Sequence, residues 1–271
     1  MIVFLIRRSF QSLIVLLVMS FVIYGLIGLM PGDPVDLMIS ADPDITSQDA
    51  ARLRTLYGLD QPLWSRYVHW LGSALSGDFG YSRLYAQPVW DAIIPALSNT
   101  LILLISSLAL ALAIALPAGV FAATRPYSLS DYGINLAAFA GISMPPFWLG
   151  ILLILLFSVV LGWLPAGGTA AASGSEGVWN HIKFLILPIA SLTIAGIGGH
   201  TRYMRASMIE TLRQDYIRTA RAKGLSESRV VLGHALRNAM IPVVTVIALD
   251  LGVLFSGALI TETVFAYPGM G

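Results

Sequence analysis

Residues 92–124, AIIPALSNTLILLISSLALALAIALPAGVFAAT, contain no Asp, Glu, Lys or Arg. A transmembrane helix needs about 20 mostly apolar residues to cross a hydrocarbon core of about 30 Å, and this stretch exceeds that length. Backbone polar groups in lipid must pair within their own segment, so the stretch is expected to be helical. It is also too continuous for the alternating strands of a membrane barrel. The sequence therefore predicts a membrane-spanning helix here.

Four similar stretches occur elsewhere in the chain. Residues 9–32, 132–175 and 184–201 lack charged side chains, and residues 238–261 are interrupted only by Asp250. Five spans are therefore expected in an all-α, polytopic membrane protein: one within residues 1–30, then about 97–124, 132–161, 182–205 and 238–262.

The composition excludes a soluble enzyme. Charged residues make up 11% of the chain, against about 25% in soluble domains. Hydrophobic residues make up 56%, and the mean hydropathy is +0.78. A soluble domain of this composition would expose large apolar patches and aggregate. The chain has no cysteine, which excludes disulfides, thiolate metal sites and a cysteine nucleophile.

The first uncharged stretch follows Arg7 and Arg8 and in this respect is similar to a secretory signal peptide. It is as long as a full span, however, and it ends in Met30-Pro31-Gly32-Asp33-Pro34 rather than in a small-x-small cleavage site. We therefore favour a retained membrane anchor over a cleaved signal.

Half of the basic residues lie in one segment. Eight of the 16 Lys and Arg residues fall between Arg202 and Arg237, against three acidic residues, which leaves a net charge of +5. Cytoplasmic loops carry such an excess, so this segment is expected in the cytoplasm together with the N-terminus and its two arginines. Residues 31–91, with eight Asp and four Arg, and the loop 162–181 are expected outside.

This alternation divides the chain into an N-terminal span (1–30), an extracytoplasmic helical cap (31–91) and a membrane core (92–271). The chain then ends outside on a turn rich in Gly and Pro, and a sixth span is expected beyond Gly271.

The external cap is expected to contain turns at 31–34 and 42–44 and two helices. Thr46 can cap the first helix with Asp49 three residues on, and Gly58 can end it. The second helix carries aromatic and apolar residues at helical spacing, namely Trp64, Tyr67, Trp70 and Leu71. The cap either packs on the outer membrane face or also forms part of a docking surface for an external partner.

The basic segment predicts two helices joined by a glycine. Ser207 to Ala222 is expected to continue the fourth span as a polar helix, Gly224 to break it, and Ser226 to cap a short helix from Glu227 to Arg237. A charged loop that only sets topology is the simpler explanation. Helix–helix connections are usually shorter than this, however, so a partner-docking role is favoured.

Several motifs together resemble one protein family, in family order over nearly the whole chain. The loop Asp215-Tyr216-Ile217-Arg218-Thr219-Ala220-Arg221-Ala222-Lys223-Gly224-Leu225 is similar to the cytoplasmic signature loop of ABC importer permeases, in the first-subunit type of the dipeptide/oligopeptide/nickel branch. Further matching segments are 31–34 (PGDP), 58–62 (GLDQP), 143–148 (SMPPFW), 234–242 (HALRNAMIP) and 261–265 (TETVF).

The resemblance implies a type I ABC importer permease fold, with residues 92–271 as its core domain, in a bacterial inner membrane. The general signature begins Glu-Ala-Ala, with Gly four residues after the second Ala; here those positions are Arg218, Thr219, Ala220 and Gly224, the Glu being replaced as this branch permits. The residues expected to couple to an ATPase are Asp215, Tyr216, Arg218, Thr219, Ala220, Arg221, Ala222, Lys223, Gly224 and Leu225.

The resemblance also implies partners. These are a second homologous permease, two ABC ATPase subunits that bind ATP and Mg, an extracytoplasmic substrate-binding protein and membrane lipid, with no nucleic acid. The chain agrees with this, because it contains no G-x-x-x-x-G-K-[ST] loop to cradle ATP. No cofactor is expected in this chain.

The transport pathway is expected where the permeases meet. Met144, Pro145, Pro146 and Phe147 interrupt the third span, either as a packing kink or as part of a gate. Asp250 is the one acidic residue deep in a span, and it should face the pore or a partner, either contacting a substrate amine or metal or pairing with a polar residue of the other permease. Glu262 either lines the mouth of the pathway or caps the following turn, and we favour the turn.

No catalytic or metal-ligating constellation is apparent. The four histidines, His69, His181, His200 and His234, are scattered, and neither H-E-x-x-H nor G-x-S-x-G occurs. The cluster 196–199 (GIGG) indicates close helix packing. An intramembrane hydrolase would need a buried nucleophile–base pair, which is not evident. A secondary carrier would need inverted repeats with broken helices in both halves, and only one broken segment is seen.

The substrate is the least determined property. A small peptide is favoured because it is common in this branch. Nickel chelates, glutathione and opines are the alternatives within the same importer class.

Overall fold

The computed structural model describes residues 2–29, 35, 46–56, 58–82, 84–170, 174 and 177–271. The motif at 31–34, the turn at 42–44 and Glu176 lie outside the described residues. The chain forms two compact units, Met1–Trp90 and Asp91–Gly271, which are described separately. Apart from one short hairpin, the regular structure of these residues is helical, so the all-α prediction is confirmed.

In its described residues the first unit has α1 (Ile2–Gly28), α3 (Ser47–Leu56), α4 (Leu63–Leu75) and the hairpin of β1 (Tyr81–Ser82) and β2 (Gln87–Pro88). Tyr67 joins α4 to α1. Its ring packs edge-on against Phe21 at 5.1 Å, and its hydroxyl lies 2.7 Å from the Ser20 hydroxyl and donates to the Leu17 carbonyl at 3.2 Å. The predicted aromatic helix therefore uses its aromatic residues to pack on the N-terminal span.

The helix α3 has both of its predicted ends. Asp49 N–H donates to the Thr46 hydroxyl and Thr46 N–H donates to the Asp49 carboxylate, each at 3.3 Å, which is a reciprocal capping box. At the other end Gly58 adopts a positive φ of 63°, and Leu59 N–H closes the last turn on the Arg54 carbonyl.

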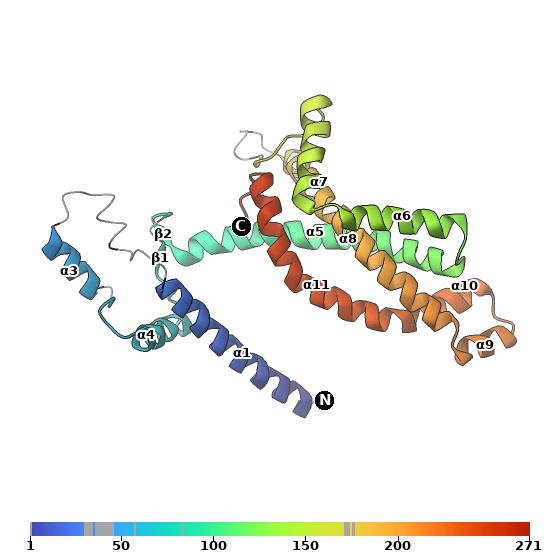
Figure 1. The fold of residues 1–271 in the computed structure, drawn as a ribbon, viewed down its shortest axis with the longest axis horizontal. Helices are drawn as coiled ribbons and strands as arrows, with labels where there is room; N and C mark the ends of the chain where they lie inside the picture. Colours follow the sequence, from blue (N-terminus) through green and yellow to red (C-terminus); the bar gives the residue numbers. More distant parts are fainter. Residues whose placement is uncertain are drawn as a thin grey trace. The chain divides into compact units, whose positions relative to one another are not determined.

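The second unit is a helical bundle, coloured from turquoise to red in Figure 1. Its elements are α5 (Val89–Thr124), α6 (Leu129–Ser143), α7 (Pro146–Leu153), the π-helix η1 (Ile154–Val160), α8 (Val178–Leu212), α9 (Asp215–Ala222), α10 (Glu227–Arg229), the π-helix η2 (Val230–Ala235) and α11 (Leu236–Val264). In the described residues, four helices are long and apolar enough to cross a membrane, and a bent pair brings the number to as many as five.

The bent pair occupies the third predicted span and breaks where Met144, Pro145 and Pro146 predicted an interruption. In place of one helix over 132–161, α6 and the α7–η1 segment meet at an angle of 97° (Figure 1). Met144 is extended, with φ −99° and ψ 124°, because a residue before proline is driven out of the helical region. Pro146 opens the next helix, where its missing N–H costs nothing. Ser191 of α8 donates to the Pro146 carbonyl at 2.6 Å and holds the corner.

Glycines bring α8 against its neighbours. A Cβ on Gly198 would lie 2.7 Å from Ile142 Cγ1 and closer still to the Ala138 carbonyl, and a Cβ on Gly119 of α5 would lie 2.7 Å from Met204 Cβ. The predicted close packing is thus confirmed for Gly198. Gly199, by contrast, faces open space.

A buried ion pair ties the start of α6 to α8. Arg205 donates from Nε and Nη2 to the two carboxylate oxygens of Asp131, both at 2.6 Å. Asp131 is 2% exposed and also accepts from Tyr127 N–H and the Asn135 amide. Such a bidentate pair sets both distance and orientation. Its two residues are 74 positions apart, and no local sequence pattern predicted the pair.

Candidate functional site

The loop between α8 and α11 is the first candidate site. The single polar helix predicted over Ser207–Ala222 is wrong, because α8 ends at Leu212 and α9 begins at Asp215. Gln214 is extended between them, with ψ 150°. The chain turns here because the turn directs α9 back towards the bundle, where the Ile217 side chain becomes fully buried.

The inner face of α9 packs on the chain's own core. Ile217 is 0% exposed and Ala220 is 6% exposed. Both belong to one cluster contributed by α5, α8, α9, η2 and α11, whose buried members are Ala123, Met204, Met208, Ile217, Ala220, Val230, Ala235, Ala239 and Val243. Leu225 packs against the same cluster. Of the predicted coupling residues, Ala220 and Leu225 therefore hold α9 in place.

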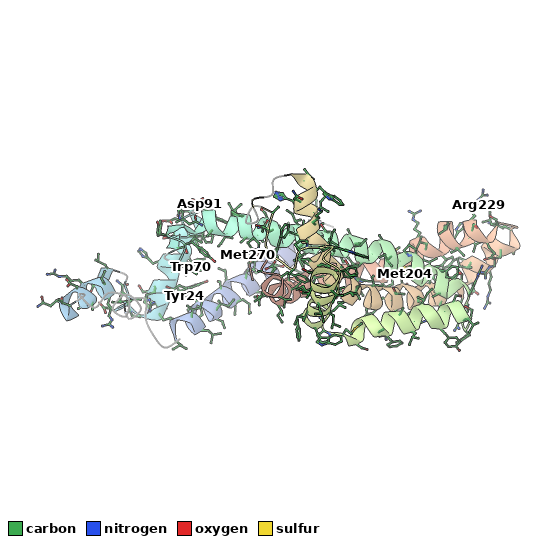
Figure 2. All side chains as sticks on the ribbon, turned by 90° about the horizontal axis from the view of Figure 1, so that it is seen from above. Tyr24, Trp70, Asp91, Met204, Arg229 and Met270 are labelled. Atoms are coloured by element: carbon green, nitrogen blue, oxygen red, sulfur yellow. The ribbon has the colours of Figure 1, made fainter. Side chains whose placement is uncertain are left out.

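The outer face of α9 carries the other predicted coupling residues. The exposed members are Asp215, Tyr216, Arg218, Thr219, Arg221, Ala222, Lys223 and Gly224. Arg221 forms an ion pair with Glu227 of α10 at 2.7 Å, so its positive charge is balanced within the loop. Arg218 lies 3.3 Å from Asp215 at the surface, where such a pair contributes little. In the described part of the chain Lys223 has no ion pair. In Figure 2, Met204 lies among the helices and Arg229 at the outer end of the loop.

Gly224 ends α9 as predicted. Its φ of +78° is in the left-handed region, which favours glycine. Gly224 N–H donates to the Arg221 carbonyl, and Leu225 N–H reaches back to the Ala220 carbonyl. This hydrogen-bond pattern closes the helix and returns Leu225 to the core.

The segment after Gly224 differs from its prediction. Ser226 begins a helical segment at Glu227, but its side chain makes no capping hydrogen bond. The segment does not stop at Arg237, since α10, η2 and α11 follow one another without a break. Burial of Val230 and Ala235 in the α9 cluster makes this continuous helix the better packed arrangement.

The predicted pathway residues lie in different surroundings. At the corner between α6 and α7, Pro145 and Phe147 are exposed, whereas Met144 and Pro146 are half-buried. Asp250 has a side chain 42% exposed, and its carboxylate lies 3.7 Å from His200 Nδ1 of α8. His200 of the same chain is therefore within ion-pair distance of the Asp250 carboxylate.

Glu262 lies under the C-terminal turn. It is 1% exposed and accepts from the Thr100 hydroxyl at 2.5 Å and from Gly271 N–H at 2.8 Å. Thr100 also accepts from Met270 N–H at 2.9 Å. The carboxylate thus fastens residues 265–271 to α5 and α11.

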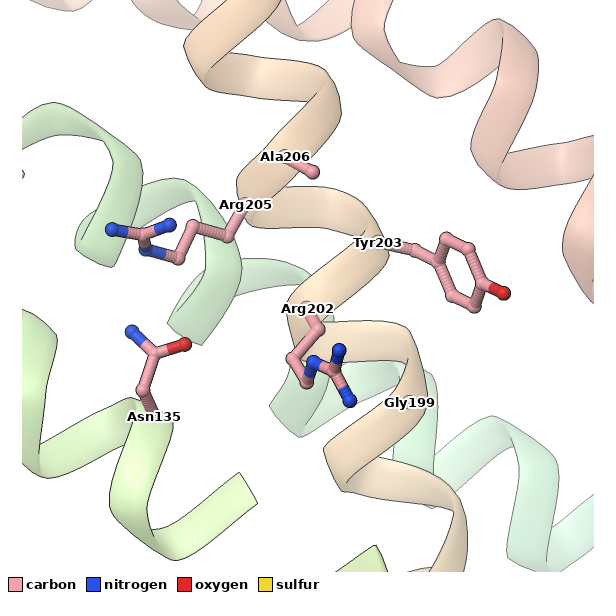
Figure 3. Close-up of a pocket in the computed structure, with 6 residues that line it drawn as sticks. All are labelled: Asn135, Gly199, Arg202, Tyr203, Arg205 and Ala206. Carbon is pink, nitrogen blue, oxygen red and sulfur yellow. The ribbon is translucent and has the colours of Figure 1, made fainter. Parts of the chain in front are cut away.

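A polar pocket on α8 was not predicted. It has a volume of about 380 Å³ and is lined by Asn135, Gly199, Arg202, Tyr203, Arg205 and Ala206 (Figure 3). A sequence signal was present, because Arg202 directly ends the uncharged run 184–201. In the described residues, no three His, Asp or Glu side chains gather as metal ligands would.

These features define a multi-pass membrane protein. It has long apolar helices and a bent helix pair, and the polar loop between α8 and α11 contains a helix of its own that packs on the bundle. Residues 115–271 match the family of binding-protein-dependent transport system inner membrane components, and residues 1–104 match the N-terminal region of such components. The chain belongs to this family. It is a permease subunit of an ABC importer in the inner membrane, not an enzyme.

Curated relatives cover almost the whole chain. The oligopeptide transport system permease protein AppB of Bacillus subtilis (strain 168) is 42% identical over 269 residues, which are 99% of this chain and 84% of AppB. The dipeptide transport system permease protein DppB of Escherichia coli (strain K12) is 36% identical over 292 residues, covering 100% of this chain and 86% of DppB. The glutathione transport system permease protein GsiC of Escherichia coli O1:K1 / APEC is 40% identical over 268 residues, which are 99% of this chain and 84% of GsiC.

Proposed function

We propose that this permease imports small peptides as part of a complex with a second permease, two ATPase subunits and an external substrate-binding protein. Similarity to AppB and DppB favours peptides, and similarity to GsiC keeps glutathione, itself a peptide derivative, as the second candidate. ATP and Mg would be bound by the ATPase subunits.

The outer face of α9 is the proposed ATPase contact. The observation that carries this proposal is the division of α9 into two faces. Its inner face is buried in a cluster shared by α5, α8 and α11, while its outer face is polar and exposed. A force applied to the outer face would therefore move these three helices together, as in a hinge or shear transition.

The α9 loop and the N-terminus are proposed to lie in the cytoplasm. The segment from Arg202 to Arg237 has a net charge of +5, which the positive-inside rule places on that side. The ATPase subunits bind ATP in the cytoplasm, so a cytoplasmic α9 loop is on the side where it could contact them.

The absence of native cysteine allows a direct test. Lys223→Cys, on the outer face of α9, should form a cross-link with a thiol-reactive ATPase, and the cross-link should change when ATP is bound. Trp179→Cys, 64% exposed at the opposite end of α8, is the matched control and should form none. An equal yield from both positions would exclude α9 as the contact.

Function is tested on the reconstituted complex. Loaded binding protein should stimulate ATP hydrolysis, and uptake of a labelled dipeptide should require ATP. A glutathione-loaded binding protein provides the comparison for the second candidate. Uptake by the permease alone, without ATP, would instead support a secondary carrier.

A further inference from the structure

The open face of α8 differs from the lipid-facing surfaces of its neighbours. From Lys183 to Leu212, Tyr203 is the one large apolar side chain of α8 that is exposed. The exposed surface of α6 is instead built from large apolar residues, including Leu129 at 91% and Leu136 at 73%. A span that faces lipid exposes large apolar side chains, whereas polar and ionisable residues face protein or a water-filled cavity.

Small residues leave room on this face. Gly199 has no atom within 4 Å of where a Cβ would stand, and Ala206 is exposed. Together with Asn135, Arg202 and Tyr203 they border the pocket of about 380 Å³. We call these five residues the Arg202 face.

The two arginines that line the pocket differ in whether a carboxylate pairs with them. Arg205 is neutralised by Asp131, with both carboxylate oxygens engaged. Arg202 has no carboxylate partner among the residues that the structure describes, and its guanidinium lies over the Phe139 ring at 4.7 Å. Stacking uses the flat face of a guanidinium and leaves its N–H edge free to bind an anion. In Figure 3, Arg205 points towards Asn135 and Tyr203 projects from the other side of α8.

We propose that the Arg202 face lines the transport pathway and that the Arg202 guanidinium receives the C-terminal carboxylate of a passing peptide. This rests on the proposed peptide substrate. One free guanidinium in an open pocket suits a transient contact, because a transport site must bind its cargo and then release it. The contact would be a charge-assisted hydrogen bond from Arg202, because the Asn135 amide already donates to Asp131.

The first test measures peptide uptake per ATP hydrolysed in proteoliposomes containing the whole importer. Arg202→Gln should lower this ratio about tenfold, because it removes one hydrogen bond between charged groups. Arg202→Lys should restore part of it, since the positive charge is kept. Arg237→Gln removes an exposed arginine of α11 that does not line the pocket, and it should leave the ratio unchanged. An unchanged ratio in Arg202→Gln would overturn the carboxylate contact.

Membrane composition separates a peptide carboxylate from a lipid phosphate. The difference between wild type and Arg202→Gln should be the same in neutral liposomes and in liposomes containing phosphatidylglycerol. If it vanishes in neutral liposomes, Arg202 binds a lipid headgroup and the proposal is overturned.

The second test measures whether the Arg202 face is accessible to water. Ala206→Cys should react with a membrane-impermeant, positively charged thiol reagent, and transported peptide should slow the reaction. Leu136→Cys, on the exposed apolar face of α6, should not react. An unreactive Ala206→Cys would overturn the pathway assignment. Labelling of Ala206→Cys in an importer that moves no peptide would instead overturn the proposed substrate alone.

Discussion

The Asp131 carboxylate and the Arg205 guanidinium form two parallel hydrogen bonds of 2.6 Å between helices α6 and α8. Asp131 is almost fully buried, and the Arg205 side chain is 23% exposed. The pair lies at the end of α6 that follows the short turn from α5, so it sets how α6 lies against α8. It also neutralises the arginine next to the Arg202 face.

Breaking this pair should destabilise the permease. Asp131→Asn leaves the partly buried Arg205 without a counter-charge, which costs about 3 kcal/mol. Thermal denaturation of the purified importer should therefore begin at a lower temperature. The double variant Asp131→Asn with Arg205→Gln should lose less than the sum of the two single losses, which a double-mutant cycle measures. Strict additivity would show that the two side chains are not coupled.

Adjacent glycines of α8 should respond differently to the same substitution. Gly198→Ala forces a methyl group against the Ala138 carbonyl and should cost about 1–3 kcal/mol, as overpacking does. Gly199→Ala meets open space and should be neutral or stabilising by up to about 1 kcal/mol, because alanine favours helix. The denaturation temperatures of the two variants provide the comparison. Equal effects would contradict the close approach of α6 and α8.

Gly224 should tolerate asparagine and reject valine. Its φ of +78° is accessible to Asn, whereas a β-branched residue is strained there. Gly224→Val should therefore distort the end of α9 and lower peptide uptake and stimulated ATP hydrolysis together, with membrane insertion intact. Gly224→Asn serves as the control and should retain both activities. Normal transport by Gly224→Val would show that this turn has no part in coupling.

Removing the Glu262 carboxylate should release the C-terminal turn. Glu262→Ala leaves the buried Thr100 hydroxyl without its acceptor, at about 1–3 kcal/mol, and releases the N–H of the exposed Gly271 to water. Residues 265–271 should then become accessible to limited proteolysis. Glu210→Ala removes an exposed acid from α8 and should leave the digestion pattern unchanged. Protection in Glu262→Ala would mean that other contacts suffice to hold the turn.

Uncharged runs predicted the long helices well, because length and absence of charge are local properties. The helix boundaries of α3 were equally accessible, since Thr46, Asp49 and Gly58 act within a few residues of one another. Local patterns also located the turn at Gly224.

Long-range geometry was not accessible in the same way. The break between α8 and α9 depends on where Ile217 can be buried, and the Asp131–Arg205 pair joins residues 74 positions apart. Likewise, Met144-Pro145-Pro146 predicted an interruption but not its angle of 97°, because the Ser191 hydroxyl holds that corner from another helix.

On the ATPase contact proposed above, the two faces of α9 separate recognition from stability. Eight residues are too few to form a stable helix alone, since isolated helices need about 12–15 residues, so α9 keeps its helical form only on the folded bundle. Its outward residues, apart from Arg221 and Gly224, make no contact within the core cluster. An engineer could therefore exchange these outward residues between related importers, keeping Ile217, Ala220, Arg221, Gly224 and Leu225, and on the proposed contact redirect the permease to a different ATPase without rebuilding its membrane domain.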